Sequence, residues 1–519
     1  MALADYYSRG ALAAAQVLSE FDEGRFRGKL QETPVGIAFD ESILTPEGHT
    51  LAELLTRLLS RLYPRLVLLG PPDAVGQLAA LSKEINPAIE ITDDEATVGI
   101  SIGAVRDPFE TTFYAGSAGW DALLSATRIR TTGDTENPFG AAVAACLAAA
   151  NIFRRVFLPD WKEHVDESIR FSAWSLDRTD RPTRTRQASW HLSSDAVLVG
   201  VGAVGNAALW TLARAPVDGT LHLVDPQRIE LSNIQRYVLA TRADDGRSKV
   251  ELGASWSTRG LTLLPHQLGL TEFLSRNGYT WDYFLLGLDS ARDRRSAQAA
   301  LPRWIGNAWT QPGDIGVSTH PRFGEVGACV ACLYLPGGRL QNEDELVAAA
   351  LSVPQLQMEI RTLLYSGAPL QRGFLEVVAA AVNKPVETLL QFEGRSIRNL
   401  YVEGFCGGAV IPIGEAGRPP EDLHVPLAHQ SALAGVLLGA SLVRSNLSGD
   451  PSTTSATRIN VLQAVGSHLA QPIRASRDGR CICDDTVFRD RYQAKYIRGG
   501  ASQRTKRAIP KAIVPGERT

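Results

Sequence analysis

The feature that most constrains the fold of this chain is a strand, glycine turn and helix within residues 195–250. The apolar run 196–199 predicts a buried strand, and a helix is predicted directly after the turn. Gly200, Gly202 and Gly205 place the sequence G-x-G-x-x-G between the two. Glycines there let the backbone approach a phosphate closely, and the helix N-terminus offers unpaired N–H donors. The pattern therefore predicts an α/β unit that binds a nucleotide.

The next residues indicate which nucleotide is bound. A second predicted strand, 220–224, ends at Asp225, which is placed to accept hydrogen bonds from ribose hydroxyls. The glycine motif by itself would suit NAD, FAD or a simple glycine turn. Asn233, Arg236 and Lys249 follow, and a dehydrogenase has no need of such side chains. Because cations stabilise charge that shifts between phosphates during transfer at the α-phosphorus, these residues favour a triphosphate.

The run VDPQRIELSNIQRYV, followed by RSKVELG, resembles the ThiF/MoeB and ubiquitin-activating enzyme superfamily. Members of that superfamily use ATP and Mg²⁺ to adenylate the C-terminal glycine of a ubiquitin-fold protein. The resemblance implies a Rossmann-like adenylation domain, the ThiF fold. It assigns the ribose contact to Asp225, phosphate contacts to Asn233, Arg236 and Lys249, and a magnesium-linked carboxylate to Asp289 at the end of a later predicted strand.

The chain departs from the superfamily pattern at one position of this motif. Many relatives have D-x-D where this sequence reads Asp225-Pro226-Gln227, so the second carboxylate is missing. The missing carboxylate affects only an accessory contact of the motif.

Residues 1–165 predict a second α/β unit with the same order of parts. Its glycine turn reads Gly70-Pro71-Pro72, and the two prolines remove amide donors that a phosphate cradle needs. We interpret this half as a degenerate, inactive adenylation-like domain, which makes the chain a pseudo-dimer and leaves higher oligomers open. In related enzymes an arginine near the start of one half reaches the nucleotide held by the other. Arg9 is the candidate, and a solvated surface arginine is the alternative.

Further boundaries follow from composition and patterning. We expect a linker or crossing segment at 166–194, the nucleotide-binding part of the active adenylation domain at 195–335, a small helical insertion with the catalytic-cysteine segment at 336–415, the remainder of the adenylation domain at 416–498, and a flexible tail at 499–519. The insertion resembles the small cysteine domain of ubiquitin-activating enzymes. Sulfur-carrier enzymes have much less sequence here, so its size favours thioester transfer.

Two cysteine pairs lie on either side of the insertion. Cys329 and Cys332 form a C-x-x-C pair, typical of a redox dithiol or of half a zinc site. With Cys481 and Cys483 they would supply four thiolates to one tetrahedral Zn²⁺, as the resemblance implies. The second pair is C-x-C, where the family usually has two intervening residues. Buried or vestigial thiols are the alternative.

Cys406 lies in YVEGFCGG, which predicts a glycine-flanked turn that leaves the sulfur accessible. By resemblance, this cysteine receives the activated carrier as a thioester. The alternative is a small buried residue at a tight turn. Cys146, in AAVAACLAAA, is predicted to be a buried and inert thiol.

Composition excludes several classes of function. A formal charge of −3 over 519 residues leaves no polyanion-binding footprint, so nucleic acid is not an expected partner. The longest strongly apolar run, 432–443, is too short to span a bilayer, which needs about 20 residues. Six cysteines in so long a chain do not make a disulfide scaffold. We therefore expect a cytoplasmic enzyme without a membrane partner.

The leading hypothesis is an enzyme that acts in two steps. ATP activates the C-terminal carboxylate of a ubiquitin-like protein as an adenylate, and Cys406 then holds this carrier as a thioester for a ubiquitin-conjugating-enzyme-like partner. One alternative ends the adenylation in sulfur transfer or in modification of a small molecule or peptide. A second alternative is an inactive nucleotide-binding scaffold. By resemblance, the two-half organisation is similar to activating enzymes of bacterial conjugation systems, some of which serve antiviral defence.

Overall fold

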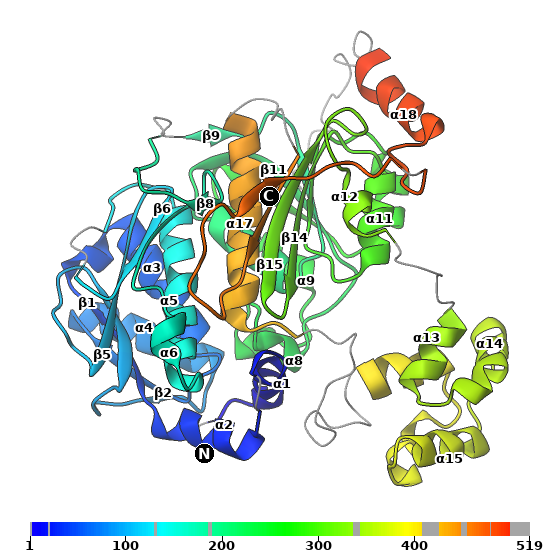
Figure 1. Cartoon of the computed structure of the whole chain (residues 1–519), viewed down its shortest axis with the longest axis horizontal. Coiled ribbons are helices and arrows are strands. Elements are labelled where there is room, and N and C mark those ends of the chain that lie inside the picture. The colour runs from blue at the N-terminus through cyan, green and yellow to red at the C-terminus, as the bar shows by residue number, and fades with distance from the viewer. Residues whose placement is uncertain are drawn as a thin grey trace, which may run out of the picture.

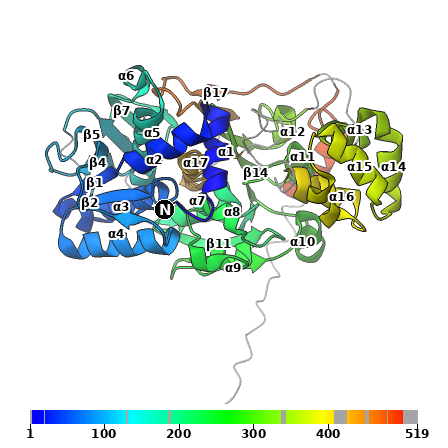
Figure 2. The same cartoon turned by 90° about the horizontal axis from the view of Figure 1, so that it is seen from below.

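The chain folds into two α/β halves and a separate cluster of helices (Figures 1 and 2). The first half is built on an 8-stranded sheet and the second on a 9-stranded sheet. The computed structural model describes residues 3–18, 21–128, 132–184, 189–335, 343–406, 425–447, 454–477 and 479–498.

The first sheet has the strand order β3-β2-β1-β4-β5-β6-β7-β8. Strands β1 to β5 are parallel, whereas β6, β7 and β8 are each antiparallel to the strand before. The strands are β1 (Val35–Phe39), β2 (Arg65–Leu69), β3 (Glu90–Ile91), β4 (Val98–Ile102), β5 (Thr111–Ala118), β6 (Asp121–Ser125), β7 (Ser168–Ser172) and β8 (Asp177–Arg178). The helices are α1 (Tyr7–Val17), α2 (Glu23–Glu32), α3 (Pro46–Leu59), α4 (Pro72–Ile85), α5 (Phe139–Phe157) and α6 (Trp161–His164).

The second sheet has the order β12-β11-β10-β13-β14-β15-β16-β17, with β9 paired to β11. Its strands are β9 (Trp190–His191), β10 (Ala196–Val199), β11 (Val217–Val224), β12 (Leu261–His266), β13 (Tyr283–Leu286), β14 (Trp304–Gln311), β15 (Asp314–Pro321), β16 (Ser455–Ile459) and β17 (Ala470–Pro472). Its helices are α7 (Ala203–Leu212), α8 (Leu231–Ile234), α9 (Lys249–Ala254), α10 (Leu270–Asn277), α11 (Ala291–Ala299), α12 (Val330–Leu333), α17 (Ala428–Leu447) and α18 (Thr486–Gln493).

The two sheets share one topology. In each half the first five strands of the main path are parallel, in the order 3-2-1-4-5, and the next three are antiparallel additions. By position in this order, β1 corresponds to β10, α3 to α7 and α5 to α17. The predicted fold class, with two Rossmann-like α/β units in one chain, is confirmed.

Helices α5 and α17 pack against each other between the two sheets, where α17 stands upright in Figure 1. A continuous apolar core contains residues of both halves. Such burial explains why α17 has no polar stripe. Helix α5 is long and apolar enough to cross a membrane, which the run 432–443 is not, but 94% of its apolar window is buried inside the protein. Its composition is therefore that of a core helix.

The insertion has a small core of its own. Its helices are α13 (Glu343–Ala350), α14 (Gln357–Ser366), α15 (Arg372–Ala381) and α16 (Ile397–Asn399), with short 3-10 turns at Pro354–Leu356, Val386–Thr388 and Leu390–Phe392 and a π-helical segment, η6 (Leu400–Cys406). This cluster stands apart from both sheets in Figures 1 and 2. The helical insertion expected from the sequence is thus present.

Two local predictions differ from the structure. The turn Gly70-Pro71-Pro72 follows β2, which corresponds to β11, so it is not the counterpart of the phosphate turn. That counterpart follows β1, where Asp40 accepts backbone hydrogen bonds from Ser42 at 2.9 Å and Ala104 at 2.5 Å. In the expected linker 166–194, β7 and β8 extend the first sheet, because β7 pairs with β6.

Candidate functional site

The predicted nucleotide residues lie at one edge of the second sheet. Strands β10, β11 and β13 are parallel neighbours, and Val199 pairs in register with both Val224 and Leu286. The segments leaving these strands carry the glycine turn, Asp225 and Asp289. The strand order reverses between β10 and β13, and open α/β sheets bind their ligands at the carboxyl ends of the strands beside such a switch point.

The turn between β10 and α7 needs glycine. Gly200 has a φ of +88°, a conformation that favours glycine. A Cβ added to Gly205 would lie only 2.2 Å from the Gly200 carbonyl oxygen, so α7 can approach the strand only without a side chain there. A Cβ on Gly202 would meet nothing nearer than the Tyr237 hydroxyl, at 3.6 Å. The turn therefore leaves room above Gly202, beside the first N–H groups of α7.

Asp225 stabilises this turn. Its carboxylate accepts hydrogen bonds from the backbone N–H groups of Val201 and Gln227, both at 2.8 Å. The residue is buried. Each carboxylate oxygen can accept a further hydrogen bond, so Asp225 keeps acceptor capacity for a ligand hydroxyl.

Lys249, the first residue of α9, is held by Gln227. Its Nζ donates a hydrogen bond to the Gln227 Oε1 at 2.6 Å, and its backbone N–H donates to the Gln227 carbonyl at 3.2 Å. Gln227 stands where D-x-D relatives have their second carboxylate. A neutral amide therefore positions the ammonium group without neutralising its charge.

The Arg236 guanidinium lies within electrostatic range of four ionisable side chains: Tyr237, Arg9, Glu230 and Asp289. Burial lowers its pKa most, and the like charge of Arg9 lowers it further, while Tyr237 and the two carboxylates raise it. Burial also lowers the pKa of Arg9, and Glu230 opposes that shift. Arg9, from α1 of the first half, therefore lies near residues of the predicted phosphate site in the second half.

Asn233 has a local structural role in α8. Its Oδ1 accepts the Glu230 backbone N–H at 3.2 Å, and the Glu230 side chain accepts the Asn233 backbone N–H, which forms a capping box. Within the part of the chain that the structure describes, the Asn233 Nδ2 makes only a long contact, 3.4 Å, with the Ser232 Oγ. The amide nitrogen is therefore the part of Asn233 best placed to bind a ligand.

Tyr237 is a residue of this site that the sequence analysis missed. The centre of its ring lies 5.3 Å from the Lys249 Nζ and 5.8 Å from the Arg236 guanidinium carbon. Its hydroxyl faces Gly202. The aromatic ring thus lies next to both cations and the glycine turn. Its position directly after Arg236 was the available signal.

Asp289 lies on the loop after β13, and its side chain is exposed. Arg294 of α11 stabilises this loop by donating hydrogen bonds to the carbonyl oxygens of Leu288 and Ala308, the second at 2.8 Å. An exposed carboxylate suits Mg²⁺, which keeps several water ligands.

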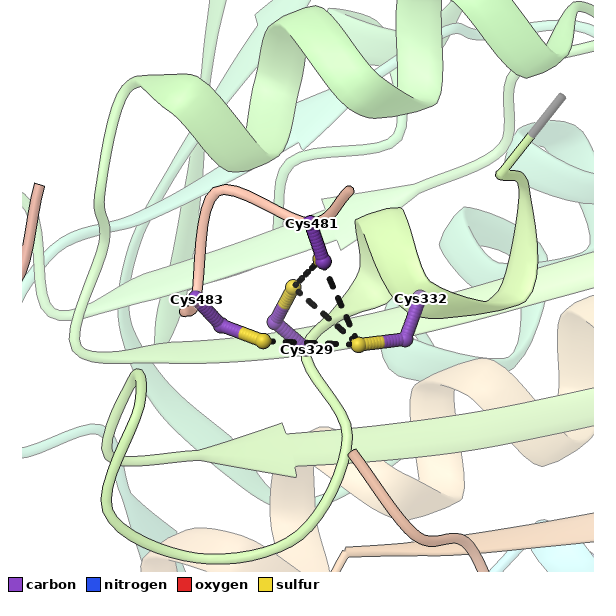
Figure 3. Close-up of side chains that lie close together, drawn as sticks. All are labelled: Cys329, Cys332, Cys481 and Cys483. Carbon is purple, nitrogen blue, oxygen red and sulfur yellow. Dashed lines mark hydrogen bonds between the residues drawn. The ribbon is translucent and has the colours of Figure 1, made fainter. Parts of the chain in front are cut away.

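The four predicted metal-ligating cysteines meet in one cluster (Figure 3). Their sulfur atoms all lie within 4.8 Å of one another. The Cys481 Sγ is 3.4 Å from those of Cys329 and Cys332, and the Cys332 Sγ is 3.4 Å from that of Cys483. Thiolates bound to Zn²⁺ at about 2.3 Å stand about 3.8 Å apart in a tetrahedron, so this set fits zinc. The C-x-C spacing of the second pair does not prevent convergence.

The cluster connects segments far apart in the chain. It joins the start of α12 to the residues before α18, and three of its four cysteines are buried. The Ser476 backbone N–H donates to the Cys332 Sγ at 3.4 Å. Hydrogen bonding from Cys329 lowers the pKa of Cys332, which favours a thiolate at that position. Donor chemistry and geometry therefore agree with a structural metal site.

Cys406 is the last residue of η6, so residues 401–406 of the glycine-flanked turn predicted at 401–408 form a π-helical segment. The side chain of Cys406 and residues 407–424, with the strand expected at 409–413, lie outside the described residues. Cys146 is fully buried in α5, and burial raises the pKa of its thiol well above the usual range. Its prediction as an inert core thiol agrees with this environment.

Two family models match parts of the chain. The ThiF family matches residues 167–256, and Prokaryotic E2 family C matches residues 38–158. The uncharacterized protein y4jF of Sinorhizobium fredii (strain NBRC 101917 / NGR234) is 40% identical over 510 residues, which cover 96% of this chain and 98% of that protein. The sulfur carrier protein ThiS adenylyltransferase of Escherichia coli (strain K12) is 38% identical over 85 residues, 16% of this chain and 32% of that enzyme.

Similar solved structures include the microcin C7 biosynthetic enzyme MccB. In complex with N-formylated MccA, it is 14% identical with a TM-score of 0.36, covering 56% of this chain and 67% of that one. E. coli MccB with ATP is 15% identical with a TM-score of 0.32, covering 56% of this chain and 66% of that one.

Proposed function

Because this chain belongs to the ThiF superfamily and to the same family as y4jF, we propose that it adenylates a ubiquitin-like protein and then holds it as a thioester. The observation that carries the proposal is a convergence at one sheet edge. The glycine turn, Asp225, Lys249 and Arg236 all lie there. Two cations next to the turn suit the phosphates of ATP, and the exchange test below separates an adenylating enzyme from a scaffold that only binds the nucleotide.

In the first step, a C-terminal carboxylate oxygen of the carrier attacks the α-phosphorus of ATP. A P–O bond forms as the bond to the β-phosphate breaks, and pyrophosphate leaves. Lys249 and Arg236 supply positive charge for the phosphates, the N-terminus of α7 supplies N–H donors, and Asp225 orients the ribose. Asp289 would hold Mg²⁺, and the bound ion would supply positive charge to the phosphates.

In the second step, the Cys406 thiolate attacks the carbonyl carbon of the acyl-adenylate. A C–S bond forms, the C–O bond to AMP breaks, and AMP leaves with the electron pair, while the thiol proton goes to solvent. The carrier is then available to a ubiquitin-conjugating-enzyme-like partner by thioester exchange. The position of Cys406 in the chain supports this role, because it is the last residue of η6, at the end of the helical insertion.

The cysteine cluster is proposed to hold a structural Zn²⁺. Four protein ligands, Cys329, Cys332, Cys481 and Cys483, would leave no open coordination position for a reaction. The metal would instead fasten the segment before α18 to α12.

The first half matches, over residues 38–158, a family model that is named for prokaryotic E2 proteins. Thioester transfer by such a domain would require an accessible cysteine. Cys146 is the only cysteine in the matched range, and it is fully buried. The strand order of this half also repeats that of the second. We therefore assign it as an inactive adenylation-like domain, with the conjugating partner a separate protein.

A second candidate function is adenylation for sulfur transfer, which the match to the ThiS adenylyltransferase favours. Modification of a small molecule or peptide is a variant of the same chemistry. Both would use the nucleotide site but would form no thioester at Cys406. The two steps can therefore be tested separately.

The test combines the full chain, ATP with Mg²⁺, and a ubiquitin-fold protein that ends in a C-terminal glycine. We expect labelled pyrophosphate to exchange into ATP only when the carrier is present, and Lys249→Met to lose this exchange. We also expect a covalent adduct that survives denaturation and is released by added thiol. It should be absent in Cys406→Ala and present in the matched control Cys146→Ala.

Each outcome has a distinct meaning. Exchange without an adduct would favour the sulfur-transfer or peptide-modifying alternative. Binding of ATP without any exchange would favour the scaffold. An adduct retained in Cys406→Ala would move the acceptor to another residue.

A further inference from the structure

One face of α3 in the first half lies against the nucleotide site of the second half. Glu53 and Arg57 lie four residues apart on this face, and Arg61 follows at the same interval in the turn directly after α3. All three are buried, with exposed fractions of 8%, 6% and 3%. Buried ionisable side chains are costly unless they are paired, so their partners indicate what they do.

Arg61 holds the segment that follows Arg236. Its guanidinium donates hydrogen bonds to the backbone carbonyls of Tyr237, at 2.6 Å, and Ala240, at 2.7 Å. A third bond, at 2.5 Å, goes to the carbonyl of Arg57 one turn earlier in α3. One side chain of the first half thus fixes two carbonyls in a segment 176 to 179 residues away.

Arg57 and Glu53 extend this contact to the helix behind the glycine turn. Arg57 donates to the Val238 carbonyl at 2.9 Å and to the Glu53 carboxylate at 2.8 Å. The other Glu53 oxygen accepts a hydrogen bond at 2.6 Å from Arg214, which follows α7. Burial would raise the pKa of Glu53, but Arg214 and Arg57 beside it lower that pKa overall. The carboxylate therefore stays charged between two cations.

The same face reaches the segment that carries Lys249. Trp256 follows α9, and its ring centre lies 5.6 Å from the Arg57 guanidinium carbon and 5.1 Å from that of Arg214. Three segments that continue from the nucleotide site thus contact this face: Arg214 after the C-terminus of α7, residues 237–240, and Trp256 after the C-terminus of α9.

We propose that Glu53, Arg57 and Arg61 are positioning residues, through which α3 of the first half sets the geometry of the nucleotide site in the second half. The inference rests on the proposed function and gives the first half a role that needs no phosphate turn of its own. Tyr237, whose ring contacts both cations, is the residue most directly placed by this contact. Without Arg61, its carbonyl and that of Ala240 would lose a charged donor.

The test measures local opening and nucleotide binding on the full chain. In Arg61→Met, we expect amide hydrogen exchange within residues 237–240 to accelerate and the Kd for ATP with Mg²⁺ to rise, each by about tenfold, the usual effect of losing a charge-assisted hydrogen bond. Arg61→Lys should recover only part of each, because an ammonium group lacks the planar fork that serves two carbonyls. If Arg61→Met does not fold, Arg61→Lys and Arg57→Lys provide the same comparison.

Arg170→Met is the matched control. It removes an ion pair with Asp121, at 3.0 Å, that lies within the first half. We expect lower stability but unchanged exchange at 237–240 and unchanged ATP affinity. Variants of Arg61 that bind ATP as tightly as Arg170→Met would overturn the positioning role and leave the proposed function intact. If the native chain binds no ATP, the proposed function fails, and the positioning role fails with it.

Discussion

The Lys249 Nζ and the Gln227 Oε1 lie 2.6 Å apart and form a hydrogen bond between a cation and a neutral amide. In relatives with D-x-D, a carboxylate stands at the position of Gln227, and it would pair with the ammonium charge. Here the partner is a neutral amide, so we expect Lys249 to remain available to a phosphate. The departure from the family pattern therefore changes how the lysine is held, and it leaves the lysine in place.

Replacing Lys249 by methionine should weaken ATP binding strongly while preserving the fold. The two side chains are similar in length, so packing against Tyr237 is largely kept, but the charged donor is lost. We expect a cost of about 1.5–3 kcal/mol, or roughly 10- to 100-fold in the Kd for ATP with Mg²⁺, measured by calorimetry. Lys162→Met, at an exposed lysine of α6, is the control and should bind normally. Equal affinity in both variants would contradict the assignment of Lys249.

The local part of this site could be predicted from the sequence because its residues are close in the chain. The apolar run before the glycines, the turn itself and Asp225 all fall within 196–225, and the structure forms them as one β-α-β unit. The same alternation of strand and helix predicted that these residues lie at the carboxyl ends of parallel strands. Patterns over short distances were therefore sufficient here.

Contacts between the halves could not be predicted in this way. Nothing local in the sequence after α3 indicates that Arg61 donates to Tyr237, because the two are 176 residues apart. The counterpart of the phosphate turn in the first half was placed after the wrong strand because the pattern of β1 is weak. Strand β1 contains Gly36, where a Cβ would lie 2.2 Å from the Phe109 ring, and such a small residue within a short strand weakens the apolar pattern. Only the resemblance indicated that the two cysteine pairs would meet.

The purified chain should contain one zinc ion bound by the cysteine cluster. We expect Cys329→Ser to lose the metal and to unfold at a lower temperature, because the link between α12 and the segment before α18 is lost. The stabilisation by bound metal is about 4 kcal/mol when free zinc exceeds its Kd a thousandfold. Elemental analysis and thermal unfolding provide the measurements. Cys146→Ala should keep its zinc, and full zinc content in Cys329→Ser would contradict the site.

His429 should make stability depend on pH. It is buried on α17, and burial, followed by the nearby Arg154, lowers its pKa to about 3. As pH falls below about 6.5, the unfolded chain binds this proton before the folded one does, so stability is lost between about 6.5 and 3, by up to about 1.4 kcal/mol per pH unit. Urea unfolding at several pH values should show a smaller acid loss in His429→Gln. The exposed His191, changed to glutamine, should leave the pH dependence unchanged.

Arg9 should affect catalysis across the boundary between the halves. It belongs to α1, yet its charge acts on Arg236 and is itself influenced by Glu230, so we expect it to reach the phosphates during transfer. Arg9→Met should lower the rate of pyrophosphate exchange by about 10- to 100-fold with little change in KM for ATP, as expected when a charge contact strengthens in the transition state.

The control for Arg9 is Arg27→Met in α2. Arg27 lies over the Tyr7 ring at 5.3 Å, so its contact is confined to the first half. Both variants remove one cation near the start of the chain and should have similar urea midpoints, which separates a loss of rate from a loss of fold. If the two also exchange pyrophosphate equally fast, Arg9 is a surface cation, and the nucleotide site is completed without a residue from α1.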